Sequence, residues 1–204
     1  MFNADGSEGS MAGNALRCMA KYLYDNHIVR KEEMTIETDK GTKTVRVYTT
    51  DGKVTSACVD MGYAALDTTA LHLNIPERQV VDYPVEIGGQ SWNITCVDMG
   101  NPHCVVFCPR VDGVDVGTVG PLFEHAPYFP DRINTEFIRV VNPSTIKMRV
   151  WERGSGETLA CGPGACAAVG AAVAPGRCGQ GRALTARGRG GGLVGTAPDE
   201  TGTP

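Results

Sequence analysis

Apolar residues recur with two different spacings along the 204-residue chain. Over residues 13–24 they recur every three to four residues, and Leu16, Met19, Ala20 and Leu23 fall on one side of the helix that this spacing predicts. A second helix is predicted over residues 162–174, where the run is rich in alanine. Each predicted helix is introduced by a stretch of glycine and other small residues.

Shorter runs with the alternation of β-strands lie between the two helices. In the first part of the chain they begin at Met34, Lys43 and Lys53, and Asp51-Gly52 separates the last two, which is a strong signal for a hairpin. Further strand-like runs follow position 62, in the order VEIGG, WNITCVDM, HCVVFC, TEFIRVV and TIKMRVWER. Each half of the chain therefore combines several strands with one helix, as in an α/β protein.

A change in pattern near Gly62 predicts a domain junction, with one domain over residues 1–62 and a second over 63–204. From about residue 175 the chain is rich in Gly, Arg, Thr and Pro and has little apolar periodicity. We therefore expect little regular structure in this tail, apart from one strand near Leu193-Val194.

Two distant stretches share nearly the same pattern. GSEGSMAGNALRC ends at Cys18 and GSGETLACGPGAC ends at Cys166. When the stretches are aligned, Ala12-Gly13 falls opposite Cys161-Gly162. Two copies far apart indicate a duplicated domain whose halves face each other, and not a tandem repeat array. The pattern therefore predicts one site built twice, with a cysteine in one copy only.

The second copy places a thiol where chemistry beside a carboxylate can occur. Cys161 precedes a Gly-x-Gly stretch and a helix, and free amides and the dipole at a helix start favour a thiolate and bind carboxylates. The dipole moves a thiol pKa by about one unit at most, so a charge partner is needed, and His103 is the candidate. Glu152 can do the opposite and keep a proton on a thiol. Two thiols can racemise or epimerise a carbon without a cofactor if one removes a proton from one face and the other returns a proton to the opposite face.

Each candidate residue also has an ordinary structural explanation. Cys161 can be a small buried apolar residue, and Glu152-Arg153 can be a surface ion pair. Turn-forming roles fit Asn3, Asn101 and Asn134, and helix capping fits Asn14. The remaining cysteines lie in apolar runs, so a place in the core is expected for Cys18, Cys58, Cys96, Cys104, Cys108 and Cys166.

Composition narrows the classes of partner. The formal net charge of −4 gives no general attraction to nucleic acid or to an anionic membrane, so small molecules or other subunits are expected. No apolar run approaches about eighteen residues and no leader pattern is seen, which predicts a cytoplasmic protein. The eight cysteines are expected to be reduced. No pair of C-x-x-C units is present, so no metal is expected.

Four longer motifs resemble the diaminopimelate epimerase family. They are FNADGSEG with the following M-GNA-RC pattern, VDMGNPHCVVF, FPDRINTEF and RVWERGSGETLACG with the following GACAA, and together they extend from about Phe2 to Ala174. The resemblance implies two pseudo-symmetric domains, each a β-barrel-like sheet around a central helix, with the active site between them. It also implies a homodimer that interconverts LL- and meso-2,6-diaminopimelate in lysine biosynthesis without pyridoxal phosphate or another cofactor.

The resemblance also assigns roles to single positions. Cys161 matches one of the two catalytic cysteines of the family, and Ala12 stands at the position of the other. His103 and Glu152 match residues that tune the thiols. Substrate-contacting positions are matched by Asn3, Gly13, Asn14, Asn101, Asn134, Glu152, Arg153 and Gly162, with Pro163 beside them.

Departures from the family pattern predict reduced turnover. Ala12 has no ionisable group, and Pro163 replaces Thr or Ser, which removes a hydroxyl and a backbone N–H while leaving the helix start tolerable. The family's N-terminal strands are absent, which predicts an incomplete first domain, and its closing C-terminal strands are not recognisable. Two alternatives stay open, namely a racemase of another amino acid on the same fold and a non-catalytic amino-acid-binding homologue.

Overall fold

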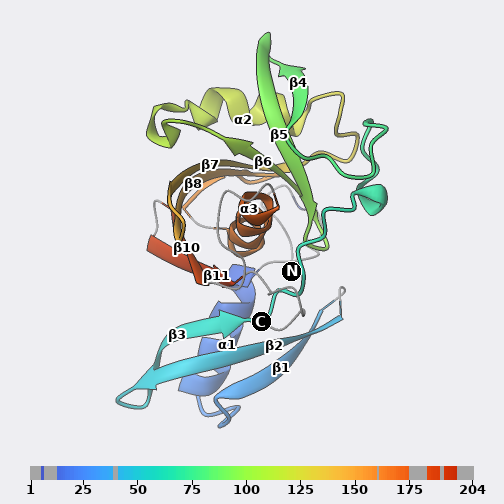
Figure 1. The fold of residues 1–204 in the computed structure, drawn as a ribbon. Coiled ribbons are helices and arrows are strands. Elements are labelled where there is room, and N and C mark those ends of the chain that lie inside the picture. The colour runs from blue at the N-terminus through green and yellow to red at the C-terminus, as the bar shows by residue number, and fades with distance from the viewer. Residues whose placement is uncertain are drawn as a thin grey trace.

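The strands of the protein form two separate sheets that are joined by a single connection (Figure 1). The computed structural model describes residue 6 and residues 13–38, 41–159, 161–174, 183–188 and 191–196. A three-stranded sheet precedes position 60 and an eight-stranded sheet follows position 82. The predicted junction near Gly62 falls between them, and the division into two domains at that residue stays a prediction.

The first body consists of one helix on one side of the smaller sheet. Helix α1 (Gly13–Asp25) packs on β1 (Glu33–Thr38), β2 (Gly41–Thr50) and β3 (Lys53–Val59), which are ordered β1-β2-β3. Asp51 and Gly52 have φ angles of 51° and 74°, so the predicted hairpin between β2 and β3 is confirmed. The core of this body is formed by Leu16, Ala20, Met34, Val45, Val47 and Val54.

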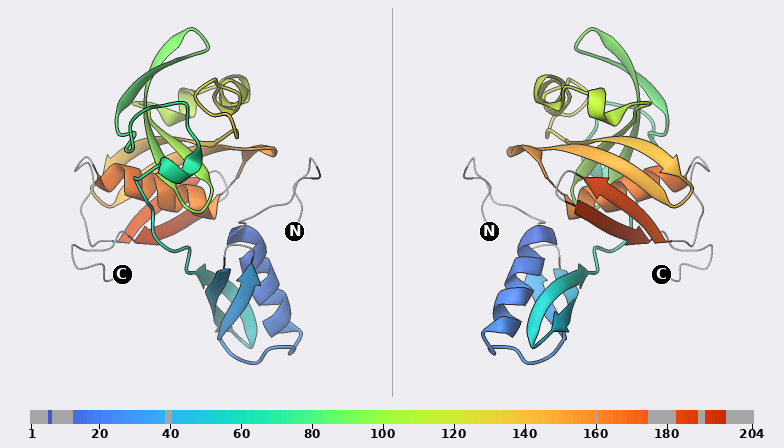
Figure 2. Two further views of the ribbon diagram at one scale, coloured as in Figure 1. Left: turned by 90° about the vertical axis from the view of Figure 1, so that its right-hand side faces the viewer. Right: turned by 90° about the vertical axis from the view of Figure 1, so that its left-hand side faces the viewer.

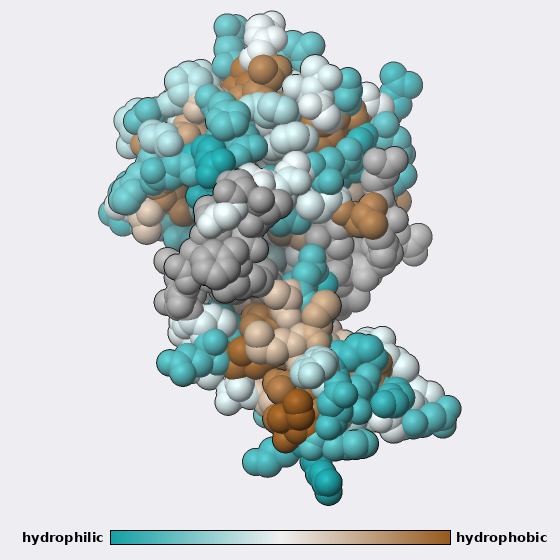
Figure 3. Space-filling model, turned by 180° about the vertical axis from the view of Figure 1, so that it is seen from behind, coloured by the Kyte–Doolittle hydropathy of each residue, from teal (hydrophilic) through white to brown (hydrophobic). Residues whose placement is uncertain are grey.

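Three side chains that were expected inside this body lie outside. Met19 is 46% exposed because the buried stripe of α1 follows Leu16 and Ala20, one turn apart, and Met19 lies beside that stripe. Cys18 and Cys58 are also exposed, so the expectation that they belong to the core is wrong. In Figure 3, apolar and small residues gather on the side of the lower body where α1 lies.

The second body is a strongly curved sheet wrapped around a helix (Figure 1). Helix α3 (Gly162–Val173) is surrounded by strands, and most of its residues are buried on every side. Its alanines and glycines allow the strands to approach closely from several directions. The strands are β4 (Tyr83–Ile87), β5 (Gln90–Asp98), β6 (Pro102–Phe107), β7 (Asn134–Asn142), β8 (Thr145–Glu152), β9 (Gly156–Thr158), β10 (Ala183–Gly188) and β11 (Gly191–Thr196).

The order of this sheet is β11-β10-β8-β7-β6-β5-β4, and β9 pairs with β8. Two of its junctions are parallel, β6 with β7 and β10 with β8. The strand expected near Leu193-Val194 is confirmed as β11, and a second strand, β10, precedes it that the sequence did not predict. Pairing with the distant strand β8 positions β10, and no local apolar pattern in the sequence signals that pairing.

Helix α2 (Val116–Glu124) covers the outer face of the large sheet and was not predicted. Its sequence contains two glycines and Pro121, which weaken helix propensity. Packing forms the helix nevertheless, because Phe123 lies edge-to-face with Trp92 and Phe137 over the second core cluster. No helix in the described part of the chain is both long and apolar enough to cross a membrane.

Gly120→Ala is expected to destabilise the protein by about 2 kcal/mol. A Cβ at Gly120 would lie 2.4 Å from Cδ2 of Trp151, and this overlap outweighs the roughly 1 kcal/mol of helix propensity that alanine adds. Urea unfolding measures the change. Gly117→Ala is the matched control on the same helix, since its Cβ would meet only the Asp115 carboxylate at 3.6 Å. Equal stability of the two variants would contradict the packing argument.

Candidate active site

The starts of α1 and α3 lie next to each other between the two bodies (Figure 2). The position that a Cβ of Gly162 would occupy is 3.8 Å from the Cα of Gly13. A Cβ of Gly13 would in turn lie 3.6 Å from Cδ of Pro163. The described parts of the repeated stretch therefore do face each other. Ala12 and Asn3, two of the predicted site residues, lie outside the described residues.

Pro163 occupies the first turn of α3 and leaves the helix intact, as the sequence predicted. Asn14 lies inside the first turn of α1, where its side-chain oxygen accepts a hydrogen bond from Arg17. Asn14 therefore does not occupy the capping position ahead of the helix. Both residues lie beside the junction of the two helix starts.

Cys161 is the N-cap residue of α3, and its Sγ accepts a hydrogen bond from the backbone N–H of Gly164 at 3.3 Å. The side chain is buried, and burial raises the pKa of the thiol well above its usual value. The carboxylates of Glu152 and Glu136 raise this pKa further, and the Gly164 N–H opposes them. Desolvation and two negative charges therefore outweigh the helix start, which by itself is not expected to form a thiolate.

Glu152 ends β8 and faces the same interior. Its carboxylate accepts a hydrogen bond from the hydroxyl of Thr158 on β9. Burial raises the pKa of Glu152, and Glu136 adds to this shift, while Thr158, His103 and the thiol of Cys161 oppose it. Glu152 and Cys161 therefore both resist a negative charge, which agrees with the predicted role of Glu152 in keeping a proton on a thiol.

His103 lies fully buried on β6 between two acceptor oxygens. Its Nδ1 is 2.7 Å from Oε1 of Glu136 and its Nε2 is 2.9 Å from Oδ1 of Asn101. These two contacts fix the orientation of the ring. Neither nitrogen bonds to Cys161, so His103 is not the direct charge partner of this thiol that the sequence suggested.

Glu136 was missed by the sequence analysis. It lies on β7, which pairs in parallel with β6, and its side chain is fully buried. The only signal in the sequence is a single acidic residue inside the apolar run TEFIRVV. In a strand with one solvent-exposed face, such a residue would ordinarily point to solvent, whereas this part of the sheet is covered on both faces.

Asn134 joins the two segments that carry Asn101 and Arg153. Its Nδ2 donates to the carbonyl of Pro102 at 2.9 Å, and its Oδ1 accepts from the backbone N–H of Arg153 at 2.9 Å. The guanidinium of Arg153 donates to the carbonyl of Asp131 at 2.9 Å. Asn134 is thus a buried connecting residue at the start of β7, and the turn role considered for it is wrong.

Glu124 supports the same region from the end of α2. Its carboxylate accepts from Nε1 of Trp151 at 2.6 Å and from the backbone N–H of Gly154 at 3.0 Å. Arg132 donates to the same carboxylate at 3.3 Å. These bonds flank Glu152 and Arg153 on both sides and hold the end of β8 in place.

A pocket of about 200 Å³ opens beside these residues. It contains one cationic side chain, two carboxylates and the amide of Asn101, so it presents both signs of charge. The amide of Asn101 links the pocket to His103 and through it to Glu136. The lining residues are Ala70, Leu71, Asp98, Gly100, Asn101, Pro102, Asp131 and Arg153. In the described ranges no three His, Cys, Asp or Glu side chains are grouped to hold a metal ion.

Comparison with solved structures supports the fold. A probable proline racemase from Agrobacterium radiobacter K84 superposes with a TM-score of 0.65 at 16% identity, covering 90% of this chain and 58% of the other. A methylitaconate-delta-isomerase superposes with a TM-score of 0.57 at 15% identity, covering 96% of this chain and 68% of the other. At these identities the likeness concerns the fold alone.

Comparison of sequences gives the family. A model of the family described as diaminopimelate epimerase matches residues 1–66 and 95–203. The diaminopimelate epimerase of Desulfovibrio desulfuricans is 48% identical over 186 residues, covering 88% of this chain and 65% of that protein. That of Moorella thermoacetica is 48% identical over 177 residues, covering 87% and 63%. The chain thus spans slightly less than two thirds of these relatives, and with its four motifs matched it belongs to the diaminopimelate epimerase family.

Proposed function

We propose that this chain is built to epimerise an α-carbon of diaminopimelate, interconverting the LL and meso forms by proton transfer on two faces. The observation that carries the proposal is the position of Cys161 at the start of α3, facing the start of α1, where burial raises the pKa of its thiol. In this reaction one base takes the α-proton from one face, and a proton on the opposite face is delivered to the same carbon. Cys161 serves one face, and residue 12 belongs to the other.

The high proton affinity of Cys161 suits it to the donating step. When the carbanion forms, the S–H bond breaks, the proton passes to carbon and the sulfur is left as a thiolate. The carboxylate next to that carbon is stabilised by the free amides and the positive dipole end of a helix start. The start of α3 offers fewer such donors than usual, because Pro163 has no N–H and the Gly164 N–H is bonded to Cys161. Weak substrate binding is the expected consequence.

The pocket beside Arg153 suits the second amino-acid end of diaminopimelate. Arg153 and Asn101 can bind a carboxylate, and Asp98 and Asp131 can face an ammonium group. A substrate with two amino-acid ends could thereby be held at both, one at the helix starts and one in the pocket. Binding at the distant end fixes the reacting carbon in place.

Ala12 favours a second candidate, a binding protein without turnover. Alanine can neither accept nor donate a proton, so one face of the substrate lacks its acid/base. The residues of the pocket and the helix starts need no second thiol to bind an amino acid. Such a protein would retain affinity and lose chemistry.

Exchange of the α-proton in deuterated buffer tests the proposal. LL- and meso-diaminopimelate and proline are incubated separately with the chain and followed by NMR, and binding is measured by calorimetry. Slow exchange confined to diaminopimelate supports the proposed function. Exchange of proline instead would indicate a racemase of another amino acid, and binding without any exchange would indicate the non-catalytic homologue.

We further propose that the protein works without pyridoxal phosphate, as a homodimer in the cytoplasm. The residues lining the pocket include no lysine, which that cofactor would need for its Schiff base. Exposed apolar side chains at and after α1, namely Met19, Tyr22 and Ile28, suit self-association. Light scattering coupled to gel filtration measures the mass in solution, and the mass of a monomer would contradict the proposed homodimer.

A further inference from the structure

Glu136 is a fully buried carboxylate, and only one of its two oxygens has a hydrogen-bond partner among the described residues. Oε1 is paired with Nδ1 of His103, and both side chains have no exposed surface. Oε2 has no hydrogen-bond partner within the described residues. A buried carboxylate oxygen without a hydrogen-bond donor lowers the stability of the fold. A role in the site would explain why the residue is present despite this cost.

Gly164 opens a direct path between this carboxylate and the sulfur of Cys161. The position that a Cβ of residue 164 would occupy is 2.4 Å from Oε1 of Glu136 and 3.1 Å from Sγ of Cys161. A side chain there would collide with the carboxylate and stand between the two groups. Because residue 164 has no side chain, the negative charge of Glu136 acts on the Cys161 thiol at short range. Both groups are buried, and electrostatic interactions are strong in the protein interior.

The groups that face Glu136 come from several elements. His103 faces it from β6, Glu152 from β8 and Cys161 from the start of α3. Glu152 and Cys161 lose protons to become negative, and a buried carboxylate opposes each of those losses.

We propose that Glu136 is a positioning residue of the site, which fixes the ring of His103 through Oε1 and keeps the proton on Cys161 through the gap at Gly164. The inference rests on the proposed function only in taking Cys161 as the acid. Glu136 itself acts through its neighbours, and His103 transmits its position to the amide of Asn101 at the pocket.

Glu136→Gln tests this role without substrate. Glutamine retains the shape and an oxygen for His103 but lacks the charge. The rate of alkylation of Cys161 by iodoacetamide is followed across pH by site-resolved mass spectrometry. The midpoint for Cys161 is expected to fall by about one unit or more, because a nearby negative charge has been removed. An unchanged midpoint in a folded variant would overturn the proposal.

Thr135→Val is the matched control. Thr135 is the neighbouring residue on β7, is equally buried and carries a hydroxyl with no partner in the described ranges. Valine has nearly the same shape, so it perturbs the strand without changing a charge. The Cys161 midpoint is expected to stay where it is, and a shift equal to that of Glu136→Gln would overturn the electrostatic argument.

Nitrogen NMR on the unaltered chain gives an answer even where Glu136→Gln fails to fold. With labelled histidine, and with His103→Gln to assign the signal, Nδ1 of His103 is expected to carry a proton that is hydrogen-bonded to Glu136. A bare Nδ1 would overturn the proposal. These readouts involve no diaminopimelate, so a shifted midpoint together with absent exchange would leave Glu136 in its role and reject the proposed function.

Discussion

Ala12→Cys is expected to raise the rate of diaminopimelate epimerisation by about 100- to 10,000-fold, the usual contribution of a positioned acid or base. Residue 12 directly precedes Gly13, which lies beside the start of the helix that carries Cys161. A thiol at position 12 would restore proton transfer on the face that Cys161 does not serve. Loss of the α-proton signal in deuterated buffer and chiral chromatography of the products measure exchange and inversion separately.

Ala12→Ser is the control for this gain. Serine is close to cysteine in shape, but its hydroxyl does not ionise in the accessible pH range, so no gain is expected. The two-base proposal would be contradicted by equal epimerisation in the unaltered chain and in Ala12→Cys. If the unaltered chain and Ala12→Cys both fold and neither exchanges the α-proton, the cause of the inactivity does not lie at position 12.

Cys161→Ala, made in the Ala12→Cys protein, is expected to lower inversion by a similar factor of about 100 to 10,000. Exchange should fall less for one of the two epimers. The thiol at position 12 can still remove a proton and return deuterium to the same face, which gives exchange with retention. The ratio of inversion to exchange therefore separates the loss of one acid from a general loss of folding or binding.

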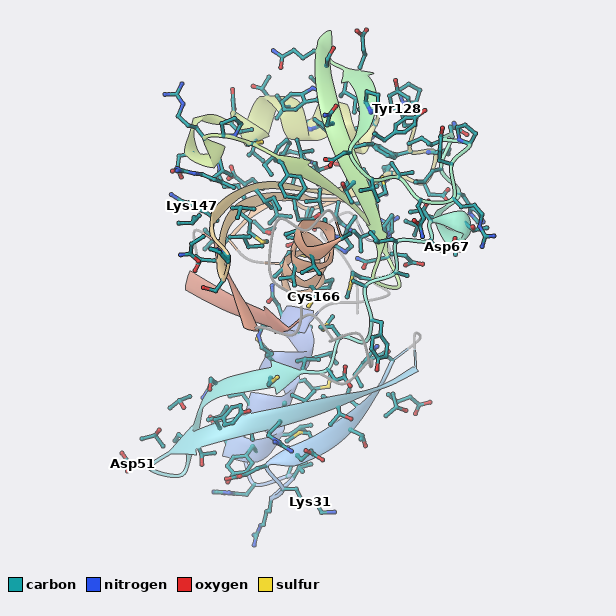
Figure 4. The ribbon with its side chains drawn as sticks, in the orientation of Figure 1. Lys31, Asp51, Asp67, Tyr128, Lys147 and Cys166 are labelled. Atoms are coloured by element: carbon teal, nitrogen blue, oxygen red, sulfur yellow. The ribbon has the colours of Figure 1, made fainter. Side chains whose placement is uncertain are left out.

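Cys166→Ala is the control on the same helix. Burial raises the pKa of Cys166 to about 11, and Cys58 and Asp60 of the first body add to this shift. In Figure 4, Cys166 lies on the side of α3 that is turned toward the first body. The ratio of inversion to exchange should stay unchanged in this variant. A change equal to that of Cys161→Ala would remove the special role of Cys161.

Much of the local structure was predictable because it depends on short-range patterns. The short apolar runs HCVVFC and TEFIRVV gave β6 and β7 correctly, because such runs are typical of strands that are buried on both faces. Asp51-Gly52 gave the hairpin because few residues adopt two positive φ angles in succession. The repeated stretch singled out Cys161 and Gly13, and the structure brings their helix starts together.

Interactions between distant residues decided the rest. Helix α2 forms although its two glycines and Pro121 disfavour a helix, because packing against the sheet stabilises it. Trp151 fills the space that Gly120 leaves open. Strand β10 is positioned by parallel pairing with β8, which no local pattern encodes.

The raised pKa of the Cys161 thiol shows the same division most clearly. The sequence by itself determined that a cysteine precedes a helix, and the dipole of that helix favours a thiolate. Only the tertiary structure placed Glu136 and Glu152 near the sulfur and buried it. The dipole acts within one turn of its own segment, whereas desolvation and charge depend on how distant strands pack, and these larger effects raise the pKa of the thiol.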